Sequence, residues 1–144
     1  MALPTASGTE TLHTILLEDV VNSAQTLITG VQHHVYTVLS VIIYCVGRQD
    51  GDNDSNAHLY LTGYGSHAGA SGHDIYIVRY DVEAAKKTFV FNDKFSFNGY
   101  EPNANTQVAR AAQAGSTPQY LKMITGHAST IVDVTCTYID QNNA

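Results

Sequence analysis

The chain carries little charge, and this scarcity excludes two classes of partner. Lysine and arginine total 7 against 13 acidic residues, which gives a net charge of -6. Nucleic-acid binding needs a clustered basic face, and the only basic cluster is Lys86-Lys87, so we expect no nucleic-acid partner. The longest apolar stretch, residues 34–46, is too short and too interrupted by Tyr, Thr and Ser to span a membrane as a helix. We therefore expect no membrane partner.

Cysteine is also scarce, with Cys45 and Cys136 alone, and both lie in apolar segments. We interpret them as buried thiols that act as small hydrophobic residues. A disulfide between them remains an alternative only if their strands lie side by side or face each other at the right separation. No CxxC pair indicates a zinc site. The N-terminal MALPTASGTET lacks a basic segment and a long apolar segment, so it predicts no signal peptide and synthesis in a cytoplasm.

Motifs of the common enzyme classes are absent. There is no GxSxG, no cysteine near a histidine in an evident turn, and only a lone GxG at residues 63–65 with no helix after it. The seven histidines lack the HxH pair of a cupin metal site. They are His13, His33, His34, His58, His67, His73 and His127. We expect no catalytic residues, no metal site and no cofactor, with convergence of His58, His67 and His73 around one glycine-rich loop as the alternative.

One acidic loop has part of the spacing of a calcium site. Asp50, Asp52 and Asp54 are spaced as the first three ligands of such a loop. Ser55 stands where that loop needs glycine, and Leu61 stands where it needs the bidentate glutamate. We interpret residues 47–56 as a hairpin loop, and a weak cation site there stays open.

What the chain does contain is β-strand pattern, strongest in residues 34–46. In strict alternation one face of that strand would carry Val35, Leu39, Val41, Ile43 and Cys45. The other face would carry Tyr36, Val38, Ile42, Tyr44 and Val46. A strand that is apolar on both faces is covered on both sides. It is therefore a central strand of a β-sandwich, or it is covered on one side by a neighbouring subunit.

Other segments with strand pattern lie between turn-forming residues. They are residues 12–21 (a strand or one short helix), 24–29, 57–64, 73–80, 88–91, 95–97, 120–125 and 130–139. The last two are expected to form a hairpin around Gly126-His127. Helix is expected only as one turn at residues 81–87, begun by Asp81, and as one short helix at residues 106–114.

This pattern predicts an all-β fold, a jelly-roll-like β-sandwich with about seven to nine short antiparallel strands and minimal helix. We expect a flexible N-terminal arm (residues 1–11), one sandwich domain (residues 12–139) and a polar tail (residues 140–144).

The order of these segments resembles that of small virion structural proteins of tailed bacteriophages. The matching stretches are LITGVQHHVYTVLSVIIYC (27–45), NAHLYLTGY (56–64), KTFVFNDKFSFNGYE (87–101) and the strand pair at residues 120–139. Many such proteins have a Pro-Ala-Gly turn before the long strand, and this chain has Thr29-Gly30-Val31-Gln32 instead.

The resemblance implies a non-enzymatic capsid decoration (cement) protein that binds and stabilises the assembled head. It implies the major capsid protein, or neighbouring tail proteins, as partner, a homotrimer, and location in the virion after synthesis in the host cytoplasm. A tail or nozzle accessory protein is the alternative within the same class.

A carbohydrate-binding module for host recognition is the alternative from another class. Tyr60, Tyr64, Tyr76 and Tyr80 would then stack on sugar rings and be exposed, whereas an assembly role would bury them at contacts. A small enzyme is the third hypothesis.

Overall fold

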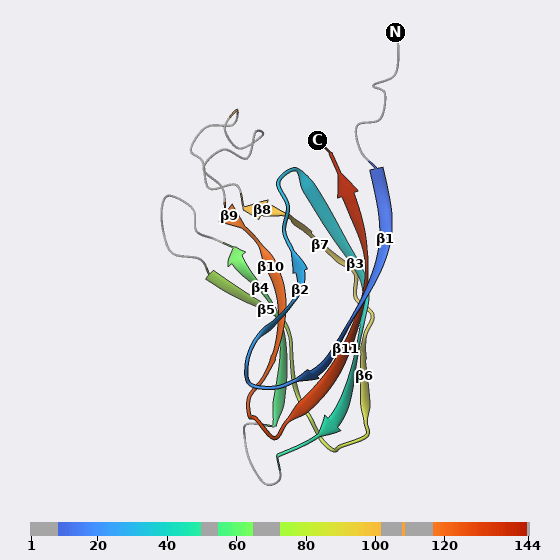
Figure 1. Ribbon diagram of the computed structural model, residues 1–144, viewed down its shortest axis with the longest axis vertical. Coiled ribbons are helices and arrows are strands. Elements are labelled where there is room, and N and C mark those ends of the chain that lie inside the picture. The colour runs from blue at the N-terminus through green and yellow to red at the C-terminus, as the bar shows by residue number, and fades with distance from the viewer. Residues whose placement is uncertain (1–8, 50–54, 65–72, 102–107, 109–116, 144) are drawn as a thin grey trace.

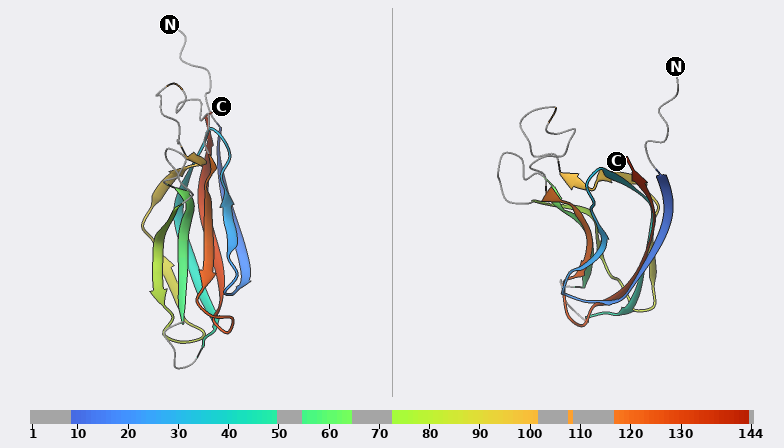
Figure 2. Two further views of the ribbon diagram at one scale, coloured as in Figure 1. Left: turned by 90° about the vertical axis from the view of Figure 1, so that its left-hand side faces the viewer. Right: turned by 45° about the horizontal axis from the view of Figure 1, so that its top comes forward.

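The computed structural model describes residues 9–49, 55–64, 73–101, 108 and 117–143, without the side chains of residues 64 and 101. Two antiparallel sheets pack face to face with the hydrophobic core between them (Figures 1 and 2). The predicted all-β sandwich is confirmed. Among the described residues, no helix is long and apolar enough to cross a membrane.

The first sheet, sheet A, has β11 at its centre beside the long strand β3. Its strands are β1 (Thr9–Val20), β11 (Ile131–Asn142), β3 (His34–Gly47), and β6 (Thr88–Phe91) with β7 (Phe95–Asn98), both on the far side of β3. Sheet B has the order β2 (Gln25–Thr29), β10 (Tyr120–Thr125), β4 (Asn56–Tyr64) and β5 (His73–Asp81). A short ribbon joins β8 (Tyr100–Glu101) to β9 (Thr117–Pro118). The chain crosses repeatedly between the sheets, as in a jelly roll.

The core forms because the strands alternate apolar and polar residues. On β4, Leu59 and Leu61 turn inward, while His58 and Tyr60 turn outward, as the alternation predicts. On β11 the buried residues are Val132, Val134 and Cys136. Each large side chain buried in this way contributes about 1.5–3 kcal/mol to the free energy of unfolding.

A β-bulge in β3 changes which side chains face the core. The pairing of β3 with β11 shifts at Leu39, because Ser40 and Val38 pair with consecutive residues of β11. The inner face of β3 therefore carries Tyr36, Val38, Val41, Ile43 and Cys45, each 2% exposed or less. The prediction that Tyr36 and Val38 share a face with Ile42 and Tyr44 was wrong, since strict alternation ignores the extra residue.

The segment after β5 forms no helix. Asp81 is the last residue of β5 and not a helix cap, and Val82 is buried. Lys86 has a positive φ of 65°, and its N–H donates to the carbonyl of Cys45 at 2.7 Å. The turn is thus held against β3, and the predicted helical turn was wrong. The helix predicted over residues 106–114 lies outside the described residues except for Val108.

Both ends of the domain extend further than predicted. Residues 9–11, assigned to the arm, belong to β1, and residues 140–142, assigned to the tail, belong to β11. The remaining arm residues lie outside the described part of the chain. Strands β10 and β11 lie in different sheets, so the predicted hairpin is instead a crossover. The Thr125 hydroxyl donates to the Thr130 carbonyl at 2.7 Å and holds that crossover.

Candidate interaction surfaces

Within the described ranges, no three potential metal ligands lie together. Asp50, Asp52, Asp54 and His67 are outside these ranges, so the cation loop stays untested. His58 and His73 both lie on sheet B, where His58 pairs with Arg79 and His73 pairs with Tyr64 at the other end of the same two strands. The expectation of no catalytic residue and no cofactor stays a prediction.

Both cysteines are free thiols in the core, as we predicted. They lie on neighbouring strands, where Cys45 pairs with Val132 and Cys136 pairs with Val41. Burial raises the pKa of Cys136 to about 12, and burial also raises the pKa of Cys45. Because the thiolate is the reactive form, neither cysteine is suited to nucleophilic chemistry at neutral pH.

The outer face of sheet A is apolar. Six exposed large apolar side chains lie on it, with between 39% and 69% of their surface accessible. They are Leu12, Leu16, Ile42, Tyr44, Val46 and Val90. The strand register places Leu16, Ile42 and Val90 in one row across the sheet, with Thr135 between Leu16 and Ile42. The apolar side chains thus form two groups, one on β3 and β6 and one on β1, with the polar outward residues of β11 between them.

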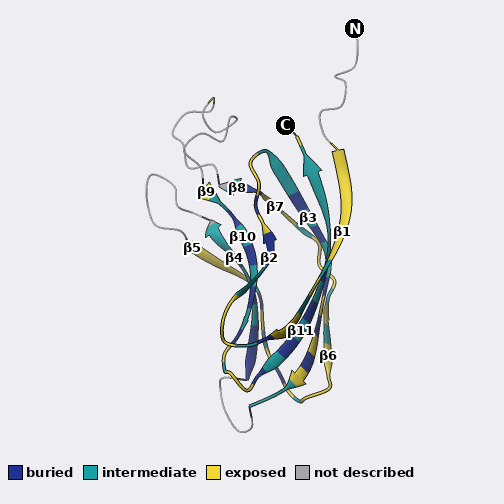
Figure 3. Cartoon of the chain, viewed as in Figure 1, coloured by how far each residue is buried: buried dark blue, intermediate teal, exposed yellow. Residues whose placement is uncertain are grey.

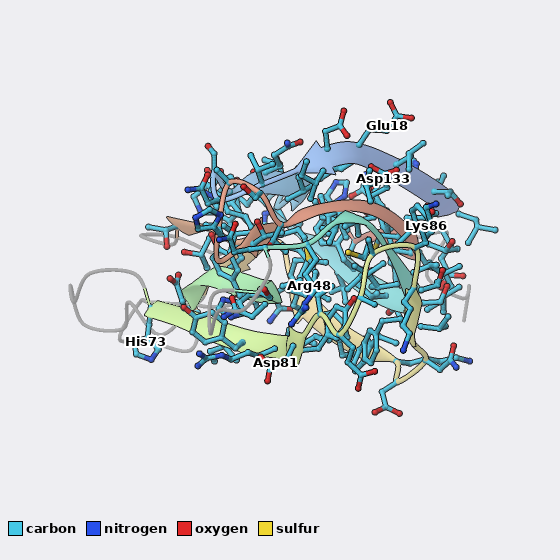
Figure 4. The ribbon with its side chains drawn as sticks, turned by 90° about the horizontal axis from the view of Figure 1, so that it is seen from below. Glu18, Arg48, His73, Asp81, Lys86 and Asp133 are labelled. Atoms are coloured by element: carbon cyan, nitrogen blue, oxygen red, sulfur yellow. The ribbon has the colours of Figure 1, made fainter. Side chains whose placement is uncertain are left out.

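Acidic residues also lie on the β1–β11 part of this outer face, where Asp133 pairs with Tyr44. Figure 4 shows Glu18 and Asp133 on the β1–β11 side of the molecule. The Asp133 carboxylate accepts a hydrogen bond from the backbone N–H of Asp19 at 2.9 Å, so it is engaged locally. Asp19 has a positive φ of 54°, and the pairing of β1 with β11 is irregular there. The regular part of β1 therefore ends just before these charges.

Strand β1 forms an edge of sheet A. It pairs with β11 on one side, and no described strand pairs with its other side. Figure 3 shows most of its length as exposed. Its inward side chains include His13, which stacks on Tyr138 with 5.2 Å between ring centroids, and Ile15, which packs on the core. Leu12 and Leu16 point to the outer face.

The outer face of sheet B has a different, aromatic character. Tyr60 and Tyr76 are cross-strand partners on β4 and β5, with ring centroids 5.7 Å apart, and Tyr76 is 57% exposed. His58 meets Tyr76 edge-on at 5.3 Å. Lys122 on β10 pairs with Tyr60. Burial lowers the pKa of His58, and its buried Nε2 atom has no hydrogen-bond partner.

The four tyrosines considered as sugar platforms do not share one face. Tyr60 and Tyr76 lie together on the outer face of sheet B, and the side chain of Tyr64 is outside the described part. The pairing of β4 with β5 shifts between Leu59 and Tyr60, so Tyr80 pairs with the buried Ala57 and stacks on Phe89 at 4.6 Å.

Tyr80 and Phe89 also line a pocket of about 300 Å³ between the β5 and β6 edges of the sandwich. Its other lining residues are Asp81, Glu83, Lys87 and Thr88. Lys87 and Glu83 form an exposed ion pair at 3.2 Å across its rim. This pocket is separate from the Tyr60–Tyr76 pair, so the two aromatic features do not form one site.

Comparison with known proteins gives fold similarity alone. No family model and no curated protein matches the chain. A solved structure of the disulfide-linked pili of Bacillus endospore appendages is 10% identical, with a TM-score of 0.44, and covers 100% of this chain and 97% of that one.

Two carbohydrate-binding module structures of xylanase 10B from Clostridium thermocellum are also similar. The CBM22-1–GH10 structure with xylohexaose is 11% identical with a TM-score of 0.42, and the match covers 96% of this chain but 26% of that one. The C-terminal family 22 module is 13% identical with a TM-score of 0.35, covering 97% and 87%. At these values the similarities carry no argument about what this chain binds.

Proposed function

We propose that the chain is a non-enzymatic virion structural protein, a capsid decoration protein that binds the assembled head through the outer face of sheet A. The observation that carries this proposal is the set of exposed large apolar side chains on β3, β6 and β1. The virion assignment comes from the resemblance of the strand order to small proteins of tailed bacteriophages. A tail accessory role would use the same face against a different partner.

The composition of β3 supports a covered outer face. The sandwich buries only one side of β3, yet Ile42, Tyr44 and Val46 on the other side are large and apolar, each about 40% exposed. A contiguous exposed apolar patch is the kind of surface that marks a protein interaction site, and Ile42 and Tyr44 on β3 lie beside Val90 on β6. A neighbouring subunit would remove that surface from water.

The proposed mechanism is physical and needs no chemistry. Burial of the apolar face against adjacent capsid subunits would link them, at about 25 cal/mol per Å² of apolar surface before the cost of association. The outer face of sheet B would then point to solvent. A homotrimer, the major capsid protein as partner and location in the virion are further parts of this proposal.

A charge placed at the centre of the face tests the proposal. We expect Ile42→Lys to weaken binding to heads that lack the protein by at least about tenfold, because the ammonium would lose water on docking. Binding is measured by cosedimentation with heads of the encoding phage. Ile124→Lys, on the outer face of sheet B, is the matched control and should bind normally. Equal binding by both variants, with unchanged melting temperatures, would contradict the proposal.

A carbohydrate-binding role is the second candidate, and the Tyr60–Tyr76 pair favours it. The exposed Tyr76 ring, beside His58 and Tyr60, supplies a stacking surface for a sugar. Lys122, on the other side of Tyr60, supplies a hydrogen-bond donor. If this role is right, the protein should bind members of a glycan array, and Tyr76→Ala should abolish the signal. Tyr44→Ala, which removes an exposed tyrosine from sheet A, should leave it intact. No glycan signal for the wild-type protein would reject this candidate.

A further inference from the structure

The edge of β1 that no described strand covers lacks the features that normally keep an edge strand from pairing. Residues 11–17 (TLHTILL) contain no proline, glycine, lysine or acidic residue. Such residues, together with bulges, protect exposed edges from adding another strand. Here the irregular pairing begins only after Leu17, and Glu10 and Glu18 lie just outside the segment. An unprotected edge of this length is suited to accept a strand.

We infer that β1 pairs with β1 of a second copy of this chain, antiparallel and across a twofold axis at Thr14. Sheet A would then continue from one copy into the other. The inference rests on the proposed assembly role and deepens it by naming the second copy as one partner. Leu12 and Leu16, the two most exposed apolar side chains on the β1 part of the face, would be covered by their counterparts.

The side chains of β1 select this register. With Thr14 opposite Thr14 of the second copy, each Leu12 lies opposite a Leu16, and Ile15 lies opposite His13. A slip by two places in either direction puts a leucine opposite Glu18 or Glu10. A slip by one place puts inward side chains on the outer face. Among these registers, the Thr14-centred one matches the leucines on the outer face, while on the inner face it sets Ile15 opposite His13.

The same register has one unfavourable feature, which makes it testable. Glu10 of each copy lies near Glu18 of the other, which comes just after the regular part of β1, and like charges brought together across strands destabilise a sheet. The pair is therefore weak in free solution. It gains strength when the outer face of sheet A holds neighbouring copies on a lattice, because tethering raises their effective concentration.

A single cysteine at the twofold axis tests the pairing. Thr14→Cys places two thiols face to face, and mild oxidation at micromolar concentration should give a disulfide-linked dimer on a non-reducing gel. Thr11→Cys is the matched control, because its two thiols would lie roughly 20 Å apart along the strands. Cys45 and Cys136 are fully buried, so they do not compete. We expect at least tenfold more dimer from Thr14→Cys than from Thr11→Cys.

A second change tests the register. Adding Glu10→Lys to Thr14→Cys replaces both like-charge pairs by opposite charges, so the dimer yield should rise at low salt. Equal dimer yields from Thr14→Cys and Thr11→Cys overturn the pairing, and no increase with Glu10→Lys overturns the register. If Thr14→Cys gives no excess of dimer, the head-binding result of Ile42→Lys is unaffected. If Ile42→Lys binds heads normally while Thr14→Cys still forms dimers, only the docking face is refuted.

Discussion

Gly30→Ala should lower the free energy of unfolding by about 3 kcal/mol or more, the range of severe steric substitutions. A Cβ atom at Gly30 would overlap the carbonyl oxygen of Gly99 and lie 2.5 Å from the carbonyl oxygen of Gln119. These obstacles are backbone atoms, so no side chain can move aside. The N–H of Gly30 also donates to the Gln119 carbonyl at 2.7 Å, which fixes the close approach.

Gly47→Ala is the matched control for this prediction. A Cβ atom at Gly47 meets the Ser129 carbonyl oxygen at 3.4 Å and the flexible Ile131 side chain at 3.7 Å, which are ordinary contacts. Urea unfolding at neutral pH, followed by circular dichroism, measures both variants. A Gly30→Ala protein as stable as Gly47→Ala would show that the junction of β2, β10 and the β7–β8 turn adjusts at little cost.

Gly30 also shows where the sequence was informative and where it was not. Residues 29–32 differ from the Pro-Ala-Gly turn of the phage proteins that the sequence resembles. The structure nevertheless requires a residue without a side chain at Gly30. Strands such as β6 (Thr88–Phe91) and β10 (Tyr120–Thr125) lie where the pattern placed them. The sequence could predict these strands because alternation and flanking turn residues are local features.

The orientation of side chains was harder to predict, because β-bulges depend on strand pairing. Leu39 is an extra residue only relative to β11, and nothing near it in the sequence marks the shift. The same cause separates Tyr80 from Tyr76, which strict alternation places on one face. Candidate sites built from alternation therefore failed wherever a bulge intervened.

The predicted helical turn failed for a tertiary reason. Asp81 and the Glu-Ala-Ala-Lys-Lys run are favourable for a helix, but this segment must cross from sheet B to sheet A. The backbone of Lys86 and Lys87 instead bonds both polar groups of the Cys45 backbone, at 2.7 and 2.9 Å. Pairing with β3 outweighs local helix propensity here.

The sequence shows that residues 34–46 are apolar on both faces, and the structure shows which face is covered. The sequence left open whether a second sheet or a neighbouring subunit covers the strand. The structure covers one side with sheet B and leaves Ile42 and Tyr44 accessible on the other. The accessible apolar side chains on that side are the physical basis of the proposed docking face.

Gln119→Glu should give a large, pH-dependent loss of stability. Gln119 is 1% exposed, and its side-chain Nε2 donates to the Asn98 carbonyl at 3.0 Å. A glutamate in this place has no N–H to donate, and its charged form would face a carbonyl oxygen in the core. We expect a loss of about 3 kcal/mol or more at pH 7, the typical cost of an unpaired buried charge.

The sign of the pH dependence follows from the buried carboxyl group. Burial without a donor raises the folded-state pKa of the introduced carboxyl above its unfolded value of about 4.3. The variant is therefore least destabilised below that value, where the protonated carboxyl can donate to the Asn98 carbonyl. It loses stability as the pH rises through the folded-state pKa.

Urea unfolding of the variant and the wild-type protein at pH 4.5 and pH 7 measures this dependence. Asn92→Asp, the same amide-to-carboxylate change at an exposed position, is the control and should change stability little at either pH. A Gln119→Glu deficit that is the same at both pH values would show that lost packing, and not the buried charge, causes it. A deficit that shrinks at pH 4.5 would show that the buried charge causes it, as expected if the Gln119 side chain links the β7–β8 turn to sheet B from a buried position.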